Sequence, residues 1–135
     1  MTYLPEEQVS VLLAYAEEAA THTHSPYSAF PVGAAVLTKD GSIYKGTNVE
    51  NASYGLTICA ERNALTSAVV GGHEDIVAIA IHAPLPSISP CGACRQFIIE
   101  FGEDVIVIFR QEGNILQMPI SELLPYGFTS KALKQ

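Results

Sequence analysis

The chain has 135 residues, a hydrophobic fraction of 48% and a charged fraction of 16%. This length predicts one domain, which we expect to span residues 1–135. The formal net charge of −7 disfavours a nucleic acid polymer and an anionic membrane surface as partners, since both attract basic proteins.

The cellular location is inferred from features that the sequence lacks. Residues 1–7 show no basic region leading into an apolar one, and no apolar run approaches the roughly 18 residues needed to cross a bilayer. The chain has 3 cysteines, an odd number that fits a disulfide framework badly. A cytoplasmic protein without membrane segments is therefore expected.

The first half of the chain predicts a helix, a hairpin and a second helix. Pro5 suits a first helical position, Gly41 lies in a hairpin turn, and the pair Gly71-Gly72 ends the second helix. The expected elements are a helix at 5–21, strands at 32–38 and 43–47, a loop at 48–57 and a helix at 59–70.

The second half continues with strands and helices in alternation. The continuous apolar run at 76–81 is typical of a strand covered on both faces. The expected elements are strands at 76–81, 105–109 and 115–118, a helix at 91–101, and a brief helix through Leu124 that Ser121 caps. This order predicts an α/β fold, a three-layer α-β-α sandwich with a mixed sheet between the helices.

Two short motifs contain every cysteine of the chain. They are Cys59-Ala60-Glu61 and Pro90-Cys91-Gly92-Ala93-Cys94. Each lies at the start of a predicted helix, where exposed N–H groups and the positive end of the helix dipole stabilise a thiolate. We therefore predict that Cys59, Cys91 and Cys94 bind one zinc ion per subunit.

The number of ligands points to a catalytic site. Structural zinc sites usually have four protein ligands, whereas catalytic sites keep one position for water. Glu61 lies two residues after a ligand and is placed to move protons during hydrolytic loss of an amine. Arg62 and Arg95 are candidates to hydrogen-bond the sulfurs, and Arg62 is favoured because it follows Glu61 on the same turn.

A non-enzymatic zinc-stabilised module is the alternative from a different class. It would need a fourth ligand, and the chain offers four histidines: His22, His24, His73 and His82. None has a ligand-like spacing to the cysteines, so solvated or core positions are expected for them.

Both zinc motifs match the signature of zinc-dependent deaminases, and the chain resembles the small cytidine deaminases over nearly its whole length. Further segments that resemble this family are 25–35, 46–52 and 123–128. The resemblance implies a five-stranded mixed sheet and hydrolytic deamination of cytidine, and of 2′-deoxycytidine, in pyrimidine salvage. A homotetramer with sites at subunit interfaces is also implied.

The resemblance also implies residue roles around the zinc. Asn48 and Glu50 would bind the sugar hydroxyls, Phe30 would pack by base and sugar, and the Ala60 backbone would help to read the base. Phe128 would reach into the pocket of a neighbouring subunit.

The substrate class follows partly from charge. Glu50 would repel a phosphate, and the motif loops contain no Lys or Arg cluster, so nucleosides are expected over nucleotides. The runner-up substrate is another 4-aminopyrimidine nucleoside, such as blasticidin S. A polynucleotide-editing deaminase is a third hypothesis, which the acidic balance disfavours.

Overall fold

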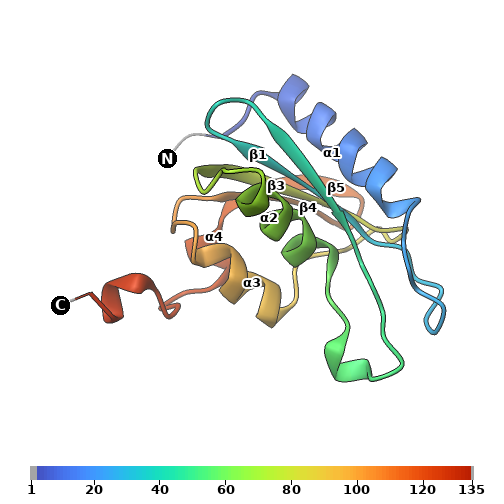
Figure 1. Ribbon diagram of the computed structural model, residues 1–135. Coiled ribbons are helices and arrows are strands. Elements are labelled where there is room, and N and C mark those ends of the chain that lie inside the picture. Colours follow the sequence, from blue (N-terminus) through green and yellow to red (C-terminus); the bar gives the residue numbers. More distant parts are fainter. Residues whose placement is uncertain (1–2, 135) are drawn as a thin grey trace.

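A computed structural model describes residues 3–134, shown in Figure 1. The α-helices of this part are α1 (Glu6–Ala20), α2 (Ala60–Val70), α3 (Gly92–Ile99) and α4 (Ile120–Leu123). Its strands are β1 (Gly33–Thr38), β2 (Ile43–Thr47), β3 (Ile76–His82), β4 (Ile106–Gln111) and β5 (Asn114–Pro119). Short 3-10 helices lie at Tyr54–Leu56 and Ser130–Ala132.

The strands form one mixed sheet in the order β2-β1-β3-β4-β5. β3 and β4 are parallel, and the other neighbouring pairs are antiparallel. Helix α1 covers one face, and α2 and α3 cover the other (Figure 1). The predicted three-layer α/β architecture is therefore confirmed.

Alternating side chains of the central strands supply both cores. Val36, Ile79 and Val107 pack on the α2 side, while Leu37, Ala80 and Ile108 pack under α1. This period of two is what a sheet covered on both faces requires.

Two glycines let the helices lie close to the sheet. A Cβ on Gly33 would lie 1.8 Å from the carbonyl oxygen of Ala16 in α1. A Cβ on Gly46 would lie 2.3 Å from the backbone nitrogen of Ala64 in α2. Both distances are far below van der Waals contact, so the second glycine is needed for α2, the helix that Cys59 caps, to pack against β2.

Two local predictions were wrong. Pro5 is the extended residue before α1 (φ −60°, ψ 151°) and not its first helical residue. Helix α4 begins at Ile120 directly after Pro119, so Ser121 lies inside the first turn and does not cap it. Among residues 3–134, none of the helices combines the length and apolar character that crossing a bilayer requires.

Candidate active site

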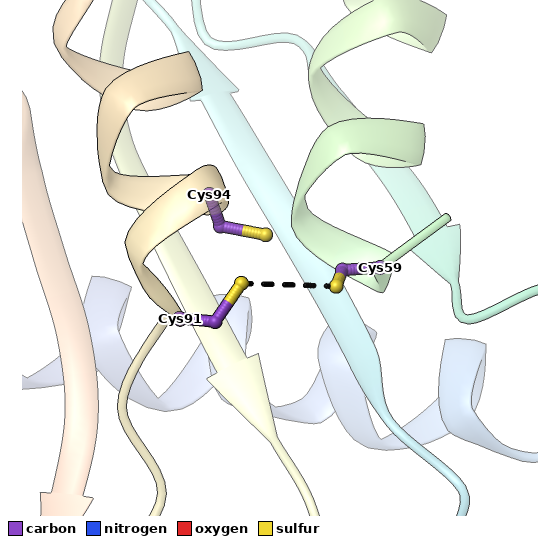
Figure 2. Close-up of side chains that lie close together, drawn as sticks. All are labelled: Cys59, Cys91 and Cys94. Carbon is purple, nitrogen blue, oxygen red and sulfur yellow. Dashed lines mark hydrogen bonds between the residues drawn. The ribbon is translucent and has the colours of Figure 1, made fainter. Parts of the chain in front are cut away.

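The candidate site lies where α2 and α3 begin. β2 and β3 both run antiparallel to β1, so they point in the same direction and end at the same edge of the sheet. Helix α2 follows β2 and helix α3 follows β3. Their N-termini therefore meet at that edge, as Figure 2 shows.

Three cysteine side chains converge between the two helix ends. Cys59 is the residue that caps α2, Cys91 caps α3, and Cys94 lies in the first turn of α3. Their Sγ atoms all lie within 4.8 Å of one another, and those of Cys59 and Cys91 are 3.9 Å apart (Figure 2).

This geometry fits zinc. Tetrahedral coordination with Zn–S bonds of about 2.3 Å places two sulfurs about 3.8 Å apart. Within residues 3–134, the group of metal-ligating side chains at this position consists of these cysteines and includes no histidine. Three thiols are one ligand fewer than the four of a structural zinc site and equal the number of protein ligands in a catalytic one.

The sulfurs differ in proton affinity. A hydrogen bond with Cys94, and then one from Arg62, lower the pKa of Cys59 to about 5. The same hydrogen bond with Cys59, together with burial, raises the pKa of the Cys94 thiol. Zinc binds thiolates, so metal binding would displace the protons of these thiols.

Each motif is followed by an arginine, and the two point to different partners. Arg62 Nη2 donates to Cys59 Sγ at 3.5 Å and to the Thr57 carbonyl oxygen at 3.4 Å. Arg95 donates from Nε to the Pro90 carbonyl oxygen and from Nη1 to that of Leu123, both at 2.8 Å. Arg62 thus brings positive charge to sulfur, whereas Arg95 joins the start of α3 to the end of α4.

Glu61 lies in the first turn of α2 and is 5% exposed. Burial raises the pKa of its carboxyl to about 7. Its side chain lines a cavity of about 190 Å³. The residues that line this cavity are Val32, Asn48, Thr57, Cys59, Ala60, Glu61, Ile81, Ile88, Ser89 and Cys91. A carboxyl that can accept and release protons therefore shares one cavity with two of the three sulfurs.

Asn48 lies in the wall of the same cavity and is 8% exposed. Its Oδ1 accepts hydrogen bonds from the Val32 backbone N–H at 3.1 Å and from Thr23 Oγ1 at 2.6 Å. Its Nδ2 donates to the Phe30 carbonyl oxygen at 2.8 Å. The predicted site residue Ala60 is also in this wall and fully buried.

Glu50 lies in a second cavity, of about 290 Å³, which it lines with Tyr27, Ser28, Tyr54 and Thr57. Thr57 belongs to both walls, so the two cavities adjoin. The Glu50 carboxylate accepts hydrogen bonds from the backbone N–H groups of Tyr27 and Ser28 and from the Ser28 hydroxyl. These bonds, the hydroxyl first, lower the pKa of Glu50.

The two predicted aromatic contacts lie outside both cavity walls. Phe30 is half-buried, and its carbonyl group holds Asn48. Phe128 is 59% exposed on the segment that leaves α4 and extends away from the sheet (Figure 1). The described chain does not bring Phe30 and Phe128 to the sulfurs, and their substrate contacts stay predictions.

Several wall residues were missed by sequence reasoning. Val32, Ile81 and Ile88 form an apolar wall, and Thr57 and Ser89 add hydroxyl groups. Ser89 directly precedes the second cysteine motif and Thr57 lies two residues before Cys59, a proximity that could have identified them. The apolar residues carried no such signal, because they resemble ordinary core.

Comparisons with known proteins agree with this geometry. Residues 6–110 match the model of the cytidine and deoxycytidylate deaminase zinc-binding region. A cytidine deaminase of Halalkalibacterium halodurans is 46% identical over 127 residues, covering 90% of this chain and 94% of the relative. The crystal structure of a cytidine deaminase from Burkholderia pseudomallei superposes with a TM-score of 0.83 at 41% identity, covering 95% of this chain and 100% of that one. A blasticidin-S deaminase of Bacillus cereus is 34% identical over 107 residues, covering 73% of this chain and 76% of the relative. The chain is a member of the cytidine and deoxycytidylate deaminase family.

Proposed function

We propose that this chain, acting as one catalytic domain, hydrolyses cytidine and 2′-deoxycytidine to uridine and deoxyuridine with release of ammonia. The observation that carries the proposal is the shared cavity, in which buried Glu61 lies beside Cys59 and Cys91. When bound by the three thiolates, zinc supplies a Lewis acid that activates water near neutral pH.

Glu61 performs the proton transfers. Its carboxylate takes the proton that the attacking water gives up and delivers it to ring N3 of the cytosine. The same carboxyl then carries the proton of the hydroxyl added at C4 to the 4-amino nitrogen, and the C4–N bond breaks to release ammonia and leave the C4 carbonyl. Because Glu61 is 5% exposed, bulk water does not compete for these protons.

Charge and hydrogen bonding favour a nucleoside over a nucleotide. Among residues 3–134, neither Lys nor Arg lines either cavity, and Glu50 places a carboxylate in the second one. A carboxylate accepts hydrogen bonds from sugar hydroxyls and repels phosphate. We therefore expect a higher kcat/KM for cytidine than for its 5′-monophosphate, and equal values would contradict this step.

The central experiment measures zinc content per subunit together with ammonia release from cytidine. One zinc ion per subunit and turnover that a chelator abolishes are the expected results. Zinc binding without turnover would instead support the non-enzymatic module. Blasticidin S belongs in the same assay, and faster turnover of that compound would favour the runner-up substrate; the more similar relatives are cytidine deaminases.

We further propose that the chain forms a cytoplasmic homotetramer with active sites at the subunit interfaces, and that it acts in pyrimidine salvage. Apolar side chains beside the cavities support an interface there, since Tyr27, Tyr54 and Leu56 are 53%, 74% and 65% exposed. Phe128 would enter the pocket of a neighbouring subunit. Light scattering coupled to size-exclusion chromatography tests the assembly, and a monomer at assay concentration would contradict it.

A further inference from the structure

We propose that Thr23 is a positioning residue for the substrate's sugar, acting through Asn48. The inference rests on the proposed function, in which Asn48 contacts a sugar hydroxyl. Thr23 lies between α1 and β1, and its Oγ1 is 2.6 Å from Asn48 Oδ1.

The hydrogen bonds of Asn48 fix which way its amide faces. The Val32 backbone N–H must donate, so the atom 3.1 Å from it is the amide oxygen. The Phe30 carbonyl oxygen must accept, so the atom 2.8 Å from it is the amide nitrogen. The donor that remains on this amide is the second N–H of Nδ2.

Thr23 holds the oxygen side of that amide. Because Oδ1 can only accept, the single hydroxyl hydrogen of Thr23 points to Asn48. Ser25 Oγ lies 2.9 Å from Thr23 Oγ1, and its own hydrogen is then the one that bridges the two hydroxyls. A relay runs from Ser25 through Thr23 to Asn48, and each bond in such a chain polarises the next.

The relay bears on the cavity because Asn48 forms part of its wall. Within residues 3–134, the three hydrogen bonds of this amide leave the second N–H of Nδ2 unused. It is therefore the group that Asn48 offers to a ligand, and a sugar hydroxyl oxygen is a matching acceptor. Thr23 gives Oδ1 a second hydrogen bond beside the one from Val32, and so holds the amide more firmly in the orientation that offers this donor to the substrate.

The first test replaces Thr23 by Val, which has nearly the same shape but no hydroxyl. Loss of one hydrogen bond of ordinary strength predicts a rise of roughly 2- to 10-fold in KM for cytidine, with kcat little changed. Thr23→Ser keeps the hydroxyl and is expected to retain the KM of the unmodified chain. An unchanged KM in Thr23→Val would overturn the inference.

The second test separates positioning from a general loosening of the fold. 2′,3′-Dideoxycytidine lacks the 2′- and 3′-hydroxyls, which Asn48 would bind, and keeps the 5′-hydroxyl, so its kcat/KM should not respond to Thr23→Val. Equal losses on cytidine and on the dideoxy compound would show a merely structural role and refute the inference. Failure of the proposed function would give a different result, because the unmodified chain itself would not deaminate cytidine.

Discussion

The beginnings of α2 and α3 are built alike but perform different tasks. Each starts with a capping cysteine, and each has an arginine close behind the motif. At α2, Arg62 and Glu61 face the sulfurs and the cavity. At α3, Arg95 faces backbone carbonyl groups, and Gln96 donates to the carbonyl oxygen of Phe128 at 2.8 Å.

This difference shows how one mode of metal binding serves two purposes. The α3 end supplies two of the three sulfurs, and its polar side chains secure neighbouring backbone. The α2 end supplies one sulfur together with Arg62, which brings charge to it, and Glu61, the proposed proton carrier. We therefore expect substitutions of the polar residues behind the cysteines to affect stability at α3, and proton transfer or zinc affinity at α2.

The largest effect is expected from Cys94→Ala. It removes a buried ligand, so zinc content should fall close to zero and activity should disappear. Metal analysis, activity and thermal unfolding measure these effects, and chelation of the unmodified chain should reproduce the loss of activity. Zinc content equal to that of the unmodified chain would show that Cys94 is not a ligand.

Glu61→Gln should separate chemistry from metal binding. The amide is nearly the same size but cannot shuttle protons, so kcat should fall by at least about 10²- to 10⁴-fold while zinc content stays the same. Glu100→Gln at the exposed end of α3 is the matched control and should keep full activity. Substantial turnover by Glu61→Gln would remove Glu61 from the mechanism.

The two arginines offer the most direct test of the contrast. Arg62→Gln removes a charged donor from Cys59 and should lower zinc affinity or activity about 10- to 100-fold. Arg95→Gln takes donors from two carbonyl groups and should lower the free energy of unfolding by about 1–3 kcal/mol. Activity, zinc content and the free energy of unfolding should be measured for both variants. Equal changes in all three quantities would show that the two arginines do not have different roles.

The sequence was most informative where chemistry is local. Cys59, Cys91 and Cys94 could be grouped because each stands at a helix start, and Glu61 lies two residues from a ligand. The link from Thr23 to Asn48 spans 25 positions and depends on how two loops pack, which no local pattern encodes. For the same reason, the sequence could not predict that Asn48 and Glu50 line two different, adjoining cavities.

The smallest effect is expected at the segment that α3 holds through Gln96. If Phe128 completes a neighbour's pocket, Phe128→Ala should raise KM several-fold without releasing zinc, because the side chain is 59% exposed and is not among the residues that line the cavity beside Cys59 and Cys91. Tyr126→Ala, on the same segment and fully exposed, is the matched control. An unchanged KM in Phe128→Ala would confine the substrate contacts to the α2 side and to the loops around Asn48 and Glu50. The contrast between the two helix ends would then extend to binding as well as chemistry.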